Sequence, residues 1–327
     1  MDQNSRIYVA GHRGLVGSAI VRRLEARGYS NIIMRTHAEL DLRDSIATDS
    51  FFAEHKPEYV FLAAAKVGGI LANNTYPAEF IHDNLAIQNS VIHSAWKHGV
   101  KRLLFLGSSC IYPKHCTQPM QEQHLLTGAL EPTNRPYALA KIAGIEMCWS
   151  YNRQYATKFL AAMPTNLYGP GDNYHLVNSH VIPALLRKFH EAKQTGATTV
   201  TVWGTGTPRR EFLYSDDMAD ACVFLLNLPE DKFNSLLGAN EMDPEGFHPP
   251  LINIGVGEDI SIKDLSLLIG QVVGYQGEIV LDTSKPDGTM RKLMDVTKIN
   301  RIGWSYTTGL EDGLRMAYQD FVNSSSD

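Results

Sequence analysis

The feature that most constrains this chain is a glycine turn near its N-terminus, G-H-R-G-L-V-G at residues 11–17. The apolar run at 6–10 before it predicts a short buried strand, and apolar periodicity over 15–27 after it predicts a helix. A strand, a glycine turn and a helix in this order can hold the diphosphate of a dinucleotide at the helix N-terminus. The segment therefore predicts a dinucleotide site, and its candidate contacts are Gly11, His12, Arg13, Gly14, Leu15, Val16 and Gly17.

Strands and helices continue to alternate through the first half of the chain. Short apolar runs predict strands at 31–34, 59–65, 101–107 and 157–163. A helix is expected at 45–55, and a 3.6-residue apolar pattern predicts a long one at about 77–98. Pro136 opens another, because proline is tolerated in the first turn of a helix. Continuous apolar strands between helices indicate a parallel sheet covered on both faces. The predicted fold class is a Rossmann-type, doubly wound α/β sheet, which binds ligands at the carboxyl ends of its strands.

The rhythm loosens after about residue 170. Further strands are expected at 199–203, 251–254 and 278–281, and helices at 182–193 and 261–273. The stretch 231–250 reads as a long surface loop, to which we assign no role. We expect an NADP-binding Rossmann domain over 1–170, joined by part of 212–250, and a smaller, interleaved substrate-binding domain formed mainly by 171–327.

Composition limits the possible partners. The 327 residues carry 30 basic and 35 acidic side chains, a net charge of −5, without a block of like charge, so nucleic acid is not expected as a partner. Residues 1–6 are polar and the longest apolar run, 59–65, is too short to cross a bilayer, so neither a secretory signal nor a membrane helix is expected. The cysteines follow no metal-ligand spacing and are expected to be reduced thiols of a cytoplasmic protein: Cys110, Cys116, Cys148 and Cys222.

The residues after the second predicted strand bear on the choice of dinucleotide. An NAD-binding chain normally carries an acid there, but residues 34–37 read M-R-T-H. Arg35, and Arg13 inside the glycine turn, would suit a 2′-phosphate, because guanidinium groups pair with phosphate. We therefore predict NADP(H) rather than NAD(H); the alternative is that both arginines are merely solvated.

Three residues suggest proton chemistry. Tyr137 and Lys141 lie four apart at the start of a predicted helix and so share one face. An ammonium beside a phenol would lower the pKa of the phenol and prepare it as an acid or base. This spacing is common by chance, but Ser108 comes just after the fourth strand, at a carboxyl end, where it could bind a substrate carbonyl.

The glycine turn, the serine after the fourth strand and Y-x-x-x-K together resemble the extended short-chain dehydrogenase/reductase family. Longer strings are similar to members that epimerise and reduce a 4-keto GDP-sugar: GHRGLVGSAI, AAAKVGGILANNTYPAEF, LGSSCIYPK, EPTNRPYALAKIAG, MPTNLYGP, NSHVIPALL and SKPDGT. The resemblance covers nearly the whole chain. It implies 3,5-epimerisation of the sugar and NADPH-dependent reduction at C4.

The resemblance also implies roles for single residues. Cys110 would be the base of the epimerisation and His180 the acid, although a lone cysteine and a lone histidine are usually inert core residues. Ser108 and Tyr137 would hold the C4 oxygen, and Lys141 the nicotinamide ribose. Other implied cofactor contacts are Arg35, His37, Leu106, Gly107, Ser108, Ser109, Lys141, Pro164, Thr165, Asn166, Leu167 and His180. The implied substrate contacts are Lys188, Trp203, Arg210 and Asp287, with Arg209 leaving open which arginine faces the ligand.

Some implications and alternatives remain open. The family often places an arginine where His37 stands, so selectivity for NADPH would depend more on Arg13 and Arg35. A nucleotide-sugar 4-epimerase would show an acid after the second strand, and a 4,6-dehydratase would show T-D-E where this chain has S-S-C at 108–110. A redox-sensing binding module would have lost the Ser/Tyr/Lys set. Relatives pair through the long helices near Asn84 and Ile142, which implies a homodimer by analogy.

Overall fold

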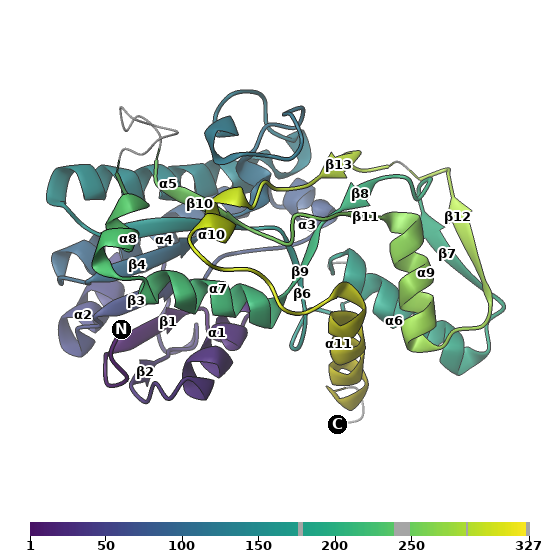
Figure 1. The fold of residues 1–327 in the computed structure, drawn as a ribbon, viewed down its shortest axis with the longest axis horizontal. Coiled ribbons are helices and arrows are strands. Elements are labelled where there is room, and N and C mark those ends of the chain that lie inside the picture. Colours follow the sequence, from purple (N-terminus) through teal and green to yellow (C-terminus); the bar gives the residue numbers. More distant parts are fainter. Residues whose placement is uncertain (176–178, 239–248, 286, 325–327) are drawn as a thin grey trace.

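The computed structural model describes residues 1–175, 179–238, 249–285 and 287–324 (Figure 1). Its centre is a sheet of six strands, all paired in parallel, which confirms the predicted fold class. In spatial order the strands are β10 (Leu251–Ile254), β5 (Phe159–Pro164), β4 (Arg102–Leu106), β3 (Tyr59–Leu62), β1 (Ile7–Ala10) and β2 (Ile32–Ile33).

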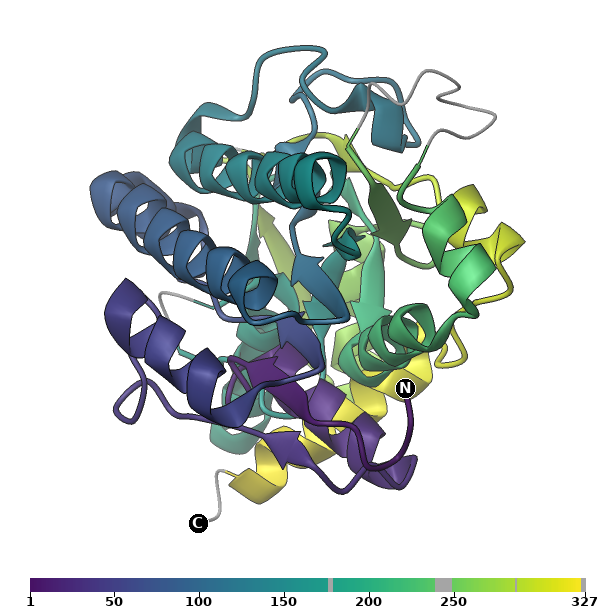
Figure 2. The ribbon, with the colours of Figure 1, turned by 90° about the vertical axis from the view of Figure 1, so that its left-hand side faces the viewer.

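Helices cover both faces of this sheet (Figure 2). One face packs against α1 (Leu15–Ala26) and α7 (Ser215–Asn227), and the other against α2 (Ser45–His55), α4 (Pro77–Lys97) and α5 (Arg135–Tyr155). Alternate strand residues serve the two cores: in β1, Ile7 and Val9 face the first and Tyr8 and Ala10 the second. Burial on both faces explains why these strands are apolar at every position.

The order of the strands places the ligand crevice. The chain leaves β1 to form β2 on one side of it and then returns to form β3 on the other side. At such a reversal the loops at the carboxyl ends diverge and leave room for a ligand. The glycine turn follows β1, and Ser108 follows β4 at the same edge of the sheet.

A second group of elements lies beside the sheet (Figure 1). Its core forms between α6 (Val181–Thr195), α9 (Ile262–Val273), α11 (Leu310–Ser324) and the parallel pair β7 (Thr199–Trp203) and β12 (Glu278–Asp282). Two small sheets complete the fold: β6 (Asn166–Tyr168) pairs with β9 (Phe212–Tyr214), and β8 (Arg209–Arg210) lies between β11 (Ile260–Ser261) and β13 (Arg291–Lys292).

The structure departs from the sequence predictions in a few elements. We predicted neither α7 nor α11, and the second strand is only two residues long. The stretch 231–250 is not a loop throughout, because α8 (Glu230–Ser235) spans its start and buries Phe233 under the guanidinium of Arg102, 4.3 Å away. Residues 239–248 lie outside the described part of the chain. Short α3 (Ile70–Thr75) and α10 (Thr297–Arg301) complete the helices named here.

Candidate active site

The glycine turn is shaped to receive a diphosphate. Gly11 has φ +86°, and a Cβ there would lie 2.7 Å from the backbone of Ala64. A Cβ on Gly17 would collide with the carbonyl oxygen of Gly11. Gly14, the N-cap of α1, offers no capping side chain, and the first turn of the helix carries no acid. The first N–H groups of α1 are therefore available to an anion, which fits a dinucleotide.

Arg13 and Arg35 both lie within electrostatic range of Glu39, which follows β2. Both lower the pKa of Glu39, although its main cause is the pair of hydrogen bonds from the backbone N–H and hydroxyl of Thr36. Glu39 is an acid in this region that the sequence analysis did not consider. His37 is largely exposed, with Nδ1 3.8 Å from Asp41, so the described contacts fix it to no part of the cofactor site.

Ser108, Cys110 and Tyr137 lie together. Ser108 begins the short 3₁₀ turn Ser109–Ile111, where its Oγ accepts a hydrogen bond from the Cys110 N–H and lies 3.0 Å from Cys110 Sγ. Tyr137, in the first turn of α5, hydrogen-bonds with the Ser108 side chain and packs edge-on against Phe80. A hydroxyl, a thiol and a phenol therefore surround one point at the end of β4.

Lys141 lies one helical turn beyond Tyr137 and is only 3% exposed. Its Nζ donates a hydrogen bond of 2.8 Å to the carbonyl oxygen of Leu106 and lies 5.8 Å from the ring centre of Tyr137. Burial disfavours the ammonium and lowers the pKa of Lys141 to about 8. Burying the ammonium of Lys141 beside Tyr137 therefore lowers the free energy of unfolding of the protein.

The prediction that Lys141 lowers the pKa of Tyr137 is wrong for this state of the protein. Burial raises that pKa, Cys110 raises it further, and only the hydrogen bond with Ser108 opposes them. Lys141 is not among the groups that lower this pKa: its ammonium lies over the phenol ring, 5.8 Å from the ring centre, and donates its hydrogen bond to the Leu106 carbonyl. Tyr137 therefore stays protonated at neutral pH, as a proton donor must.

Lys141 makes the stability of the protein depend on pH. Because its native pKa lies near 8 rather than at 10.5, the unfolded chain binds more protons between these values, and stability rises with pH. At about 1.4 kcal/mol per pH unit, burial of the charge lowers the free energy of unfolding by about 3 kcal/mol below pH 8, and this penalty has disappeared by pH 10.5.

The test is urea unfolding at several pH values. The free energy of unfolding of wild type minus that of Lys141→Met should rise between pH 8 and 10.5, whereas the difference between wild type and the surface variant Lys263→Met should not change with pH. A flat result for Lys141→Met would contradict the burial of charge.

Asn166 and His180 are the predicted site residues on β6 and at the start of α6. Asn166, just beyond β5, donates a 2.8 Å hydrogen bond from Nδ2 to the Glu211 carbonyl, so its amide is anchored. His180 is the N-cap of α6, and the protein around it lowers its pKa, which favours neutral imidazole. Within the described residues no hydrogen bond joins His180 to Cys110, so their pairing as acid and base stays a prediction.

Glu211 is a structural residue of the site that the sequence analysis missed. Its carboxylate is fully buried and accepts hydrogen bonds from the N–H groups of Val256, Gly257 and Met294 at 2.7–2.9 Å. It thereby fixes the strand that carries Arg210. The signal in the sequence was an acid directly before the apolar strand β9. An acid in such a place is buried with the strand, and a buried carboxylate needs hydrogen-bond donors around it.

The structure separates the two adjacent arginines. Arg209 Nε donates a 2.6 Å hydrogen bond to Asp259, so it serves as a structural ion pair. Arg210 donates to the neighbouring backbone carbonyl of Arg209, and its Nη2 lies against Gly288. Arg210 is therefore the arginine that lies against the segment of the predicted substrate contact Asp287.

The other predicted substrate contacts lie at the ends of β7 and β12. Trp203 is 68% exposed, with Lys285 Nζ 5.7 Å from its ring centre. Asp287 accepts hydrogen bonds from the N–H and hydroxyl of Thr205. Lys188 donates to the Thr201 carbonyl at 2.7 Å. An open indole face with cations nearby is suited to a nucleotide.

No group of three or more His, Cys, Asp and Glu side chains in the described ranges is arranged to hold a metal ion. No helix in the same ranges has both the length and the apolar character needed to span a bilayer.

The chain is similar over nearly its whole length to known proteins of one family. Residues 7–236 match the model of the NAD dependent epimerase/dehydratase family. The chain is 55% identical to GDP-L-fucose synthase 1 of Arabidopsis thaliana, over 99% of this chain and 95% of the relative, and 55% identical to GDP-L-fucose synthase of Escherichia coli K12, over 98% and 97%. A solved GDP-mannoheptose C4 reductase from Campylobacter jejuni with NADP bound is similar, at 42% identity and TM-score 0.88, over 98% of this chain and 99% of that one.

Proposed function

The chain belongs to the NAD dependent epimerase/dehydratase family, and from this premise we propose that it converts GDP-4-keto-6-deoxy-D-mannose into GDP-L-fucose. The reaction comprises epimerisation at C3 and C5 and NADPH-dependent reduction at C4. The observation that carries the proposal is the meeting of Ser108, Cys110 and Tyr137 at one point, with Lys141 beside them. Both steps need groups that hold the same ketone oxygen.

The cofactor is NADP(H), which supplies hydride to C4 when it is bound. The glycine turn and the open N-terminus of α1 would hold its diphosphate. Arg13 and Arg35, which both act electrostatically on Glu39, would pair with the 2′-phosphate. Lys141 would bind the nicotinamide ribose, which is consistent with its place under Tyr137.

Epimerisation relies on the ketone at C4, because a carbonyl acidifies the C–H bonds on both neighbouring carbons. Cys110 would remove a proton from C3 and C5, and His180 would return one on the opposite face of the ring. Ser108 and Tyr137 would hold the C4 oxygen and stabilise the enolate charge that develops on it. In the reduction that follows, Tyr137 would donate its proton to that oxygen.

The nucleotide would lie toward the second group of elements. Arg210 would meet the diphosphate, and Trp203 offers an exposed ring on which a base can pack. Lys188 donates to β7, the strand that ends in Trp203. Asp287 could accept a hydrogen bond from a sugar hydroxyl. The fixed position of Arg209 on Asp259 supports assigning the phosphate contact to Arg210.

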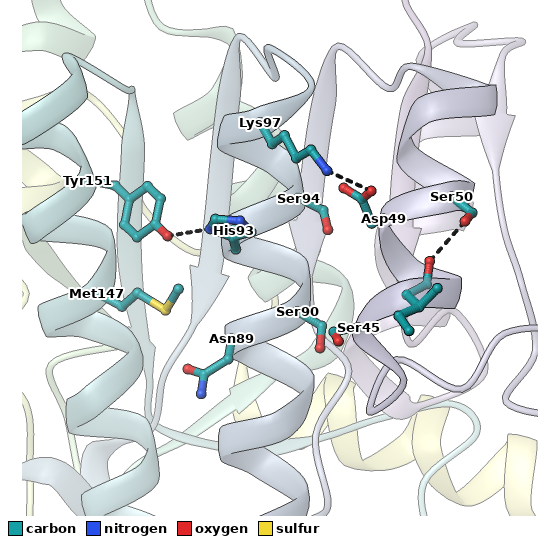
Figure 3. A pocket seen from close by; sticks show the side chains of 11 residues that line it. Ser45, Asp49, Ser50, Asn89, Ser90, His93, Ser94, Lys97, Met147 and Tyr151 are labelled. Atoms are coloured by element: carbon teal, nitrogen blue, oxygen red, sulfur yellow. Dashed lines mark hydrogen bonds and ion pairs between the residues drawn. The ribbon is translucent and has the colours of Figure 1, made fainter.

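A homodimer through α4 and α5 is part of the proposal. Asn84 and Ile142 themselves face inward, but the outer surface of these helices and α2 carries a groove of about 510 Å³ (Figure 3). Leu139 and Tyr155 expose apolar surface on α5. A second copy would cover both across a two-fold axis. Light scattering should give twice 36.4 kDa, and Leu139→Glu with Tyr155→Glu should reduce it to one chain; a monomeric wild type would contradict the dimer.

The proposal includes the domain boundaries and the cellular compartment. Residues 1–170 with part of 212–250 would form the NADP-binding domain, which is supported by the packing of α7 on α1, and 171–327 would form mainly the substrate-binding domain. Four free thiols and a reductase that consumes NADPH suit the cytoplasm.

NMR analysis of the product tests the function. Purified protein incubated with GDP-4-keto-6-deoxy-D-mannose and NADPH should consume NADPH and yield GDP-L-fucose. A 4-epimerase would instead hold NAD tightly and show no net oxidation, and a dehydratase would release a 4-keto sugar from GDP-mannose. Either result would contradict the proposal.

A further inference from the structure

Arg35 is held in place by a histidine twenty residues further along the chain. His55, the last residue of α2, places its Nε2 2.6 Å from Arg35 Nη2. The same guanidinium donates from Nη1 to the carbonyl of Met34 at 2.7 Å and lies 5.6 Å from the centre of the Phe51 ring. His55 in turn stacks on Phe51, with ring centres 4.6 Å apart. Three contacts from two elements thus fix one guanidinium.

The contact with Arg35 determines the form of the imidazole. Arginine only donates hydrogen bonds, so Nε2 of His55 must accept and cannot carry a proton. The proton of neutral His55 is therefore on Nδ1, a buried atom that makes no hydrogen bond and has Glu54 Oε1 at 3.9 Å. A cationic imidazole would lose the acceptor and place two positive charges side by side.

This arrangement leaves Arg35 able to bind an anion. A guanidinium has five N–H donors, and Met34 and His55 occupy two of them, so three remain for a phosphate. A carboxylate in the place of His55 would neutralise the guanidinium, whereas neutral imidazole fixes it and leaves its charge in full. Holding the side chain before the ligand arrives also reduces the entropy lost on binding.

We propose that His55 is a positioning residue that sets the preference for NADPH over NADH by holding Arg35 toward the 2′-phosphate. The inference rests on the cofactor placement in the proposed function. Because NADH has no 2′-phosphate, removing the acceptor at position 55 should weaken the binding of NADPH alone. A general loss of structure would weaken the binding of both cofactors.

The test measures the Kd of NADPH and of NADH by cofactor fluorescence, on full-length protein without sugar. His55→Phe keeps the ring stacked on Phe51 but removes the acceptor, and should raise the Kd of NADPH about five- to tenfold while leaving that of NADH unchanged. His55→Gln offers an amide oxygen and should restore binding to near the wild-type value. His98→Phe is the matched control, because His98 contacts Asp49 rather than Arg35, and should change neither Kd.

The outcomes separate the inference from the proposed function. If wild type binds both cofactors equally, the placement of the 2′-phosphate at Arg35 fails, and the inference fails with it. If wild type prefers NADPH but His55→Phe leaves the ratio unchanged, or changes both Kd values alike, the role of His55 is wrong and the proposed function stands. If His55→Gln did not restore NADPH binding, the idea that a hydrogen-bond acceptor at position 55 holds Arg35 would also be wrong.

Discussion

Replacing Tyr137 with phenylalanine should lower the rate of ketone reduction by about two to four orders of magnitude, the usual effect of losing a general acid. The phenol is the acid of the proposed reduction, and burial and Cys110 raise its pKa, so it keeps its proton at neutral pH. Phenylalanine keeps the ring that packs against Phe80 and Lys141, so the fold should survive. The measurement is single-turnover oxidation of NADPH with saturating keto sugar.

Tyr151→Phe is the matched control for this variant, because Tyr151 lies on the same helix but bonds to His93, in the groove of Figure 3. It should reduce the ketone at close to the wild-type rate. Tyr137→Phe should still exchange sugar protons with solvent, at a reduced rate, since Cys110 and Ser108 remain. If Tyr137→Phe reduced the ketone at a rate within about threefold of wild type, another group would have to be the acid.

Cys110→Ser should lower solvent exchange at C3 and C5 by at least about a hundredfold, the scale expected for loss of a general base. Serine preserves the small side chain and the contact with Ser108, but its hydroxyl is not ionised at neutral pH. NADPH binding should not change, because the glycine turn, Arg35 and Lys141 are untouched. The measurement is deuterium incorporation from D₂O into the keto sugar, followed by NMR without NADPH.

Cys116→Ser is the control, since Cys116 is a half-buried thiol in the following loop. It should incorporate deuterium like wild type. With NADPH present, Cys110→Ser should still reduce the ketone, but to the sugar whose C3 and C5 are not inverted. Full deuterium incorporation in Cys110→Ser would assign the base to another residue.

The local elements were largely predictable because their signals are local. The predicted helix at 45–55 and the predicted strands at 199–203 and 251–254 correspond residue for residue to α2, β7 and β10. Both strands were predicted from apolar residues in the segment itself: β7 alternates between exposed and buried positions, and β10 is buried throughout. Strands as short as β8 and β13 carry no such pattern, because their pairing depends on the partner rather than on their own residues.

The sequence by itself determined the parallel α/β sheet, the glycine turn and the residue types available for acid–base chemistry. Only the tertiary structure decided how those residues act. It placed Arg209 on Asp259 and Arg210 against Gly288, and it brought His55 to Arg35. It also reversed the predicted shift in the pKa of Tyr137, because desolvation sums over every atom around a group, and those atoms come from segments that are distant in the chain.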